Sequence, residues 1–105
     1  MPYKTIILEL LQRIPRLHDR LRHGRMLLAA TESLATALRA RHEELKKELV
    51  ATKPDLDPAQ AASAAMEIAA AEMEHRLQAA FPAEGQGQLS LDAAMAFVRS
   101  LTSRG

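Results

Sequence analysis

The chain contains no cysteine and no tryptophan among its 105 residues. The missing cysteine excludes a disulfide framework, a thiolate zinc site and a cysteine nucleophile. Aromatic residues make up only 3% of the chain, which argues against a surface that stacks nucleic-acid bases. Hydrophobic residues make up 48%, so the sequence predicts one folded domain with a core of aliphatic side chains.

Long apolar runs are also missing. No stretch of 18 apolar residues occurs, so we expect no membrane-spanning helix and no membrane partner. The apolar N-terminal stretch is interrupted by Glu9 and Arg13, which is not typical of a signal peptide. With no cysteine and no export signal, the sequence predicts a cytoplasmic protein.

Apolar residues recur at helical spacing along nearly the whole chain, and no stretch alternates with the period of a strand. The sequence therefore predicts an all-α protein: a long central helix in an antiparallel helical hairpin, followed by a short tethered C-terminal helix. We expect one domain, with a helical bundle over 1–81, a flexible linker over 82–89 and an amphipathic helix over 90–103.

Prolines and glycines divide the helical pattern. A first helix should begin near Tyr3 and end before Pro15, because proline lacks an amide donor and clashes with the preceding turn. A heptad-like pattern then runs to about Thr52 and keeps its phase through Gly24, which predicts one long helix. The alternative is a helical hairpin that turns at residues 23–25.

Two helix starts carry capping residues. Asp57 followed by Pro58 predicts the start of a third helix that runs to about Phe81. Ser90 is a good N-cap for the last helix, which should extend from Leu91 to about residue 102. We expect this last helix to pack on its own bundle; docking in a groove of another protein is the alternative.

The expected helix lengths predict self-association. A helix of about 38 residues is roughly 57 Å long, whereas the third helix would cover roughly 36 Å of it. Because exposed leucine seams are rare in monomers, we expect a coiled-coil-like homodimer, with His42 as a polar register residue or bonded to a carbonyl. The predicted dimer or helix seam comprises Ile14, Leu17, Leu21, Leu28, Leu38, Leu45 and Leu49.

Charge is balanced overall, at a net +1, but not along the chain. Residues 1–25 carry a net charge of +4 and residues 54–105 carry −4. Either these parts attract each other within a bundle or dimer, or the basic part binds an acidic partner such as nucleic acid. The candidate contacts for nucleic acid or an acidic partner are Arg13, Arg16, Arg20, Arg22 and Arg25.

One pair has the spacing of a metal site. Glu72 and His75 are three residues apart, as in di-iron helical bundles, but such a site needs two pairs and two further glutamates. His18 and His23 are five apart and point to different sides of a helix. No glycine-rich phosphate loop and no nucleophile motif occurs. The sequence therefore predicts no metal, no cofactor and no enzymatic activity.

Both ends of the chain carry short apolar patterns: residues 3–6 (Tyr-Lys-Thr-Ile), residues 8–11 (Leu-Glu-Leu-Leu) and residues 90–97 (Ser-Leu-Asp-Ala-Ala-Met-Ala-Phe). In these segments the chain resembles a set of short uncharacterised bacterial helical proteins. No activity is known for that set, so the resemblance implies a bacterial protein and no site residues. The functional hypothesis is a helical interaction or accessory protein that self-associates through apolar seams, with a nucleic-acid-binding accessory protein as the alternative.

Overall fold

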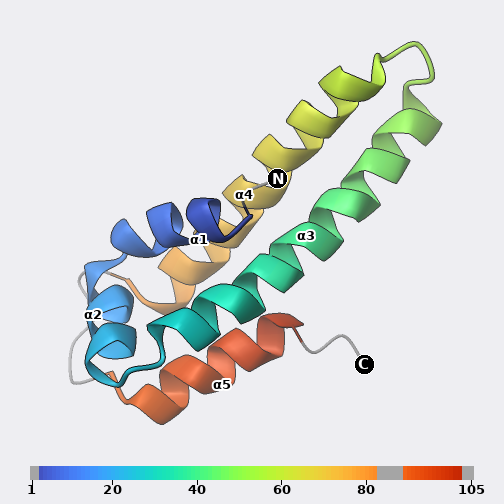
Figure 1. The fold of residues 1–105 in the computed structure, drawn as a ribbon. Coiled ribbons are helices and arrows are strands. Elements are labelled where there is room, and N and C mark those ends of the chain that lie inside the picture. Colours follow the sequence, from blue (N-terminus) through green and yellow to red (C-terminus); the bar gives the residue numbers. More distant parts are fainter. Residues whose placement is uncertain (1–2, 83–88, 103–105) are drawn as a thin grey trace.

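The computed structural model describes residues 3–82 and 89–102, which form helices and no strand (Figure 1). The molecule measures 49 × 25 × 24 Å. The helices are α1 (Tyr3–Gln12), α2 (Pro15–His23), α3 (Leu27–Thr52), α4 (Pro58–Ala80) and α5 (Leu91–Thr102). The long central helix α3 packs antiparallel with α4, while α1 and α5 pack on α3 from different sides, which confirms the predicted all-α class and hairpin.

One end of the α3–α4 hairpin projects beyond the other helices (Figure 1). We call residues 43–66, which form this projection, the arm. Its contact between the two helices is made by small and aliphatic side chains, with Leu45, Ala61 and Ala65 all buried. Because two helices form the arm alone, large parts of its surface face outward. No helix in the described ranges is long and apolar enough to cross a membrane.

The predicted single helix from Pro15 to Thr52 is wrong, and the alternative turn is present. The chain turns between α2 and α3, where Arg25 has a left-handed φ of 60°. The turn is closed by backbone hydrogen bonds from Gly24 to the Arg20 carbonyl and from Met26 to the Leu21 carbonyl, at 3.0 and 2.9 Å. The apolar phase survives this turn because α2 and α3 bury their leucines in the same core.

Gly24 is favoured by a close approach of the Leu91 side chain rather than by its own backbone angles. Its φ of −84° is ordinary. A Cβ at this position would lie 2.6 Å from Leu91 Cδ2 and 3.2 Å from the Arg20 carbonyl oxygen. The first turn of α5 therefore packs directly on the end of α2, a contact between residues far apart in the sequence.

The helix ends follow the local signals closely. Pro15 occupies the first turn of α2, and Ser90 accepts a hydrogen bond of 3.0 Å from the amide of Ala93 at the start of α5. Asp57 holds the N-cap position of α4, but its carboxylate makes no capping bond. The predicted linker over 82–89 lies outside the described residues, except for its two end positions.

Packing of α5 on its own bundle is confirmed. Ala94 and Val98 are fully buried, and Phe97 meets Phe81 edge to face with ring centroids 5.1 Å apart. Phe81, expected as the last residue of the third helix, is the residue that follows α4 and is itself 5% exposed. The C-terminal helix thus completes the core against α2 and α3.

Candidate interaction surfaces

The predicted seam residues divide into a buried group and one exposed residue. Leu17 and Leu21 are fully buried within one chain, because α2 folds back against α3 and α5. No second copy is needed to cover these two leucines. Leu28 is 69% exposed, the most exposed large apolar side chain described. The remaining seam positions are buried or half-buried within the chain: Ile14, Leu38, Leu45 and Leu49.

Leu28 lies on a face of α3 that no other helix covers. Val50 lies on the same face about six turns further along the helix and is 52% exposed. Charged side chains of both signs lie between these two apolar residues. We define the outer face of α3 as Leu28, Glu32, Arg39, Glu43, Lys46 and Val50, all of them exposed or half-buried.

Both ends of the outer face are shaped by neighbouring groups. At one end, Lys4 on α1 forms an ion pair of 3.5 Å with Glu32. Leu8 follows Lys4 by one helical turn and is 37% exposed, so it adds apolar surface beside α3. At the other end, a shallow hollow beside Val50 is lined by Glu43, Lys46, Lys47 and Ala51.

The charges on this face are ordered. Lys46 lies 3.0 Å from the Glu43 carboxylate. This hydrogen bond lowers the pKa of the Glu43 carboxyl, so that residue keeps its negative charge further into acidic pH. The surface therefore presents fixed charges of both signs between two apolar ends.

His42 is a buried polar junction rather than a residue of a dimer contact. It is 1% exposed, and its Nε2 lies 2.9 Å from the Ala62 carbonyl, which can only accept a hydrogen bond. Nε2 therefore carries a proton, and Nδ1, 2.9 Å from the Tyr3 hydroxyl, is satisfied at the same time. The alternative in which His42 bonds a carbonyl is confirmed, and this one ring joins α1, α3 and α4.

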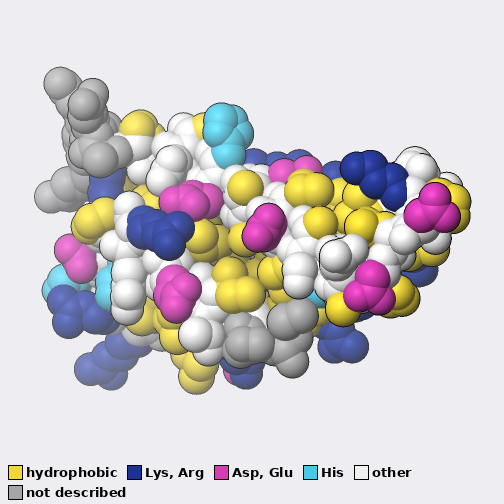
Figure 2. Space-filling model, turned by 90° about the horizontal axis from the view of Figure 1, so that it is seen from above, with side chains coloured by type: hydrophobic (Ala, Val, Ile, Leu, Met, Phe, Trp, Pro, Cys, Tyr) yellow, Lys and Arg dark blue, Asp and Glu magenta, His cyan; other side chains and the backbone are white. Residues whose placement is uncertain are grey.

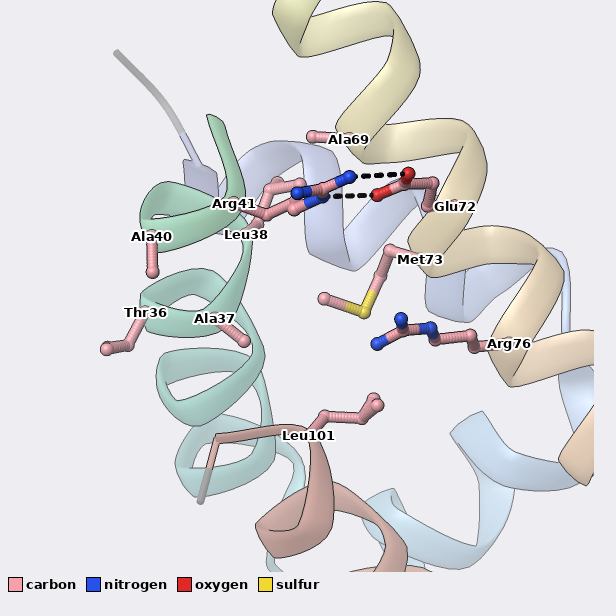
Figure 3. Close-up of a pocket in the computed structure, with 10 residues that line it drawn as sticks. All are labelled: Thr36, Ala37, Leu38, Ala40, Arg41, Ala69, Glu72, Met73, Arg76 and Leu101. Carbon is pink, nitrogen blue, oxygen red and sulfur yellow. Dashed lines mark hydrogen bonds and ion pairs between the residues drawn. The ribbon is translucent and has the colours of Figure 1, made fainter. Parts of the chain in front are cut away.

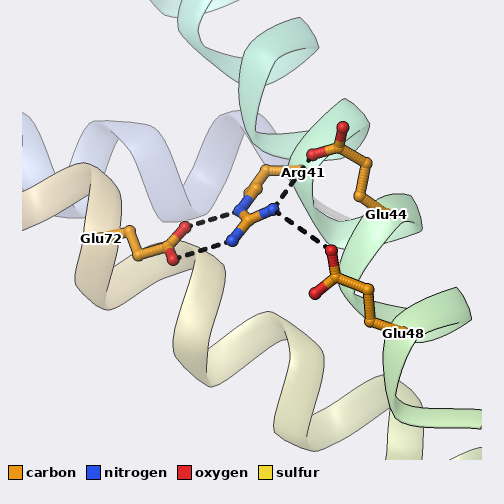
Figure 4. Close-up of polar contacts among 4 residues, drawn as sticks. All are labelled: Arg41, Glu44, Glu48 and Glu72. Atoms are coloured by element: carbon orange, nitrogen blue, oxygen red, sulfur yellow. Dashed lines mark hydrogen bonds and ion pairs between the residues drawn. The ribbon is translucent and has the colours of Figure 1, made fainter. Parts of the chain in front are cut away.

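Arg41 connects the two helices of the hairpin (Figure 4). Its Nε and Nη2 donate to the two carboxylate oxygens of Glu72 at 2.8 and 3.1 Å. Nη1 also donates to Glu44 at 3.1 Å and lies 4.0 Å from Glu48. The hydrogen bonds to Glu72 and Glu44 raise the pKa of Arg41 above its ordinary value, so the guanidinium stays charged at every accessible pH.

The ion pair with Arg41 engages Glu72, one of the two residues that have the spacing of a metal site. Glu72 uses both oxygens on Arg41, while His75 is exposed on α4. Among residues 3–82 and 89–102, no three His, Cys, Asp or Glu side chains are grouped so that they could hold a metal ion. Glu72 thus serves a cross-link between α3 and α4, in which His75 takes no part.

A cavity lies between α3, α4 and the end of α5 (Figure 3). Its apolar wall includes Met73 and Leu101, and Arg76 points into it from α4. Its volume is about 150 Å³, whereas pockets for small molecules usually measure about 300–1,000 Å³. The cavity can hold a few water molecules or one inserted side chain.

The five arginines predicted to contact nucleic acid or an acidic partner do not lie on one helical face. Arg13 lies in the turn after α1 and pairs with Glu74 at 3.1 Å, while Arg16 and Arg20 are half-buried on α2. Arg22 and Arg25 are exposed, and neither forms an ion pair within the described part of the chain. Lys, Arg and His side chains gather at this end of the molecule, opposite the arm (Figure 2).

The ion pairs bear on the uneven charge along the chain. Arg13 joins the basic N-terminal part to the acidic C-terminal part through Glu74, and Lys4 reaches Glu32. The basic and acidic parts of the chain therefore attract each other within one bundle. The cations at the end of α2 also lie where the negative end of a helix dipole favours positive charge.

A second apolar surface lies on α4. Ile68 is 41% exposed, and residues 58–66 of this helix are mostly alanine and carry no charge. Neither this surface nor Val50 was among the predicted site residues. The sequence signal for Val50 is its spacing from Leu28, which places both on one side of a helix. Comparison with known proteins finds no matching family model, no similar curated protein and no similar solved structure, so the resemblance of the chain ends stays a prediction.

Proposed function

We propose that the protein is a non-enzymatic helical interaction protein that docks through the outer face of α3 and self-associates as a homodimer. One observation carries the proposal: Leu28 is 69% exposed, whereas the leucines of the core, such as Leu34 and Leu38 on the same helix, are fully buried. Burying a leucine side chain is worth about 1.5–3 kcal/mol. Val50 and Leu8 enlarge the same surface.

The arrangement of the helices supports a binding role for this face. α3 is held on its inner side by α4, by α1 through His42 and by α5, so the outer face is presented on a braced helix. A surface that is already ordered loses little conformational entropy when it binds. Charged groups between the apolar ends would make the docking selective for a complementary partner.

The test is the solution mass of the purified chain by light scattering across a range of concentrations. We expect a dimer, and we expect Leu28→Asp to weaken it at least about 100-fold, because the charge would be buried in the interface. The fold should survive, since Leu28 does not belong to the buried core. Ala29→Asp is the matched control: it adds the same charge at the next residue, on another side of α3, and should remain dimeric. A wild-type monomer at all concentrations would refute self-association.

A nucleic-acid-binding accessory role is the second candidate. The observation that favours it is the exposed pair Arg22 and Arg25 at the end of α2, beside His23. Guanidinium groups bind phosphates without regard to sequence, and this binding weakens steeply with salt. The two roles would use different side chains and can be separated by variants.

A further inference from the structure

We propose that two copies of the chain pair through the outer face of α3 with these helices antiparallel and the two-fold axis at Arg39. The inference rests on the proposed function, because it names the partner that occupies that surface and its register. It commits to a second copy of this chain. The pattern of residues along the outer face provides the reasons.

The apolar residues fit an antiparallel pair centred on residue 39. Leu28 lies eleven residues before Arg39, and Val50 lies eleven residues after it. Antiparallel pairing about Arg39 therefore brings each Leu28 opposite Val50 of the partner subunit. At about 1.5 Å per residue, these two apolar contacts lie roughly 17 Å on either side of the axis.

The charges fit the same register. Glu32 lies seven residues before Arg39 and Lys46 lies seven after it, so each Glu32 faces Lys46 of the partner subunit. Glu43, one turn beyond Arg39, comes within reach of the partner's Arg39 and offsets the two arginines at the axis. A parallel pair would instead place Glu32 against Glu32 and Lys46 against Lys46, which like-charge repulsion disfavours.

The shape of the surface agrees with this pairing. Leu28 stands out from the start of α3, and the shallow hollow beside Val50 offers a place to receive it. Lys4 already lies 3.5 Å from Glu32, so Leu8, one turn further along α1, lies beside the Leu28 end of the contact. Because the dimer has a two-fold axis, the contact of Leu28 with the hollow beside Val50 occurs twice.

The apolar surface on α4 fits a second copy less well. Ile68 lies next to Glu67, and the outward side of α4 along the arm carries no cation that could face this carboxylate. Two copies meeting there would bring Glu67 side chains together without an opposite charge. The outer face of α3 is self-complementary in charge, whereas this surface is not.

The absence of cysteine allows a direct test by engineered disulfides. The Cα atoms of a disulfide lie within about 7 Å of each other. Under mild oxidation, Arg39→Cys alone should form a covalent dimer, and so should a mixture of Leu28→Cys and Val50→Cys chains. Leu28→Cys alone and Val50→Cys alone should not, because each position lies about 33 Å from its own symmetry mate along the helix. Ile68→Cys is the control on the other surface and should stay monomeric on denaturing gels.

A second measurement keeps the register testable if cysteine variants fold poorly. Glu32→Lys and Lys46→Glu should each weaken the dimer about tenfold or more, and the double charge swap in one chain should restore most of the affinity. Cross-linking by Leu28→Cys alone, or by Ile68→Cys alone, in a dimeric protein would overturn this register but not the proposed self-association. A monomeric wild-type chain would overturn both.

Discussion

At the scale of single residues, the turn between α2 and α3 depends on two adjacent positions with different demands. Gly24 has ordinary backbone angles but lies against Leu91, whose side chain would lie 2.6 Å from a Cβ and would have to shift to admit one. Arg25 has room but adopts a φ of 60°, which costs a residue with a Cβ about 1–2 kcal/mol. The glycine thus serves the packing of α5, and the arginine next to it takes the strained conformation.

This division of roles predicts that two substitutions at Arg25 change the free energy of unfolding differently. Arg25→Gly relieves the strain, but the glycine also makes the unfolded chain more flexible, which offsets part of the gain in stability. The free energy of unfolding should therefore stay within about 1 kcal/mol of wild type or rise. Arg25→Val should lower it by about 1–2 kcal/mol, because a β-branched residue tolerates a positive φ poorly. Both variants remove the same charge. Urea unfolding followed by circular dichroism measures the difference, and equal stabilities would show that the turn is not strained.

At the scale of helices, sequence patterns predicted what is local and missed what depends on tertiary packing. Pro15 and Ser90 mark helix ends through their own backbone chemistry, and both predictions are confirmed. The turn at Gly24 was not favoured because the apolar phase continues through it, and the approach of α5 that favours the glycine comes from the other end of the chain.

The same limit applies to the candidate site. The heptad spacing predicts Leu28 in the buried seam, and the same position one and two heptads later in α3, at Ala35 and His42, is buried. Leu28 itself is 69% exposed, because no other helix covers this side of α3 where the helix begins after the turn at Arg25. The spacing predicts the side of the helix on which a residue lies, whereas the cover over each part of that side depends on tertiary packing.

The clearest link between two helices is the ion pair of Arg41 with Glu72. Both side chains are about one-third exposed, at 31% and 38%, so solvent screens the pair. In a double-mutant cycle with Arg41→Met and Glu72→Met, we expect a coupling free energy of about 0.5–1 kcal/mol, because the guanidinium donates to both carboxylate oxygens. A parallel cycle with Arg41→Met and Glu44→Met should give less, since that pair shares one hydrogen bond within a single helix.

Chemical denaturation of all four proteins in each cycle gives the coupling. A coupling near zero between Arg41 and Glu72 would mean that the hairpin is held by its apolar contact alone. The small side chains of Ala61, Ala65 and Ala69 along α4 would then account for the close packing of α3 and α4.

At the scale of the whole molecule, charge is separated along the long axis. The arm carries five carboxylates against three lysines, while the opposite end carries the exposed cations of α2. In a dimer formed antiparallel through α3 with its axis at Arg39, Arg25 lies roughly 21 Å from the axis, three residues beyond the Leu28 contact. Self-association and binding of an anion use different side chains, so variants can remove each without the other.

Binding to duplex DNA gives the sharpest comparison between the two candidate roles. With about three cations in contact, the affinity should fall about 40-fold between 50 and 200 mM salt. We expect no complex at 200 mM salt in fluorescence anisotropy with a labelled duplex, because the end of α2 offers few cations and Asp19 lies among them. A complex that persists at 200 mM salt should be lost in the double variant Arg22→Gln, Arg25→Gln if it depends on the end of α2. It should survive in the charge-matched variant Lys47→Gln, Lys53→Gln. This combination of results would make nucleic-acid binding, rather than helix docking, the principal role. Leu28→Asp would then weaken the complex only slightly, since it removes no cation but adds a carboxylate three residues from Arg25.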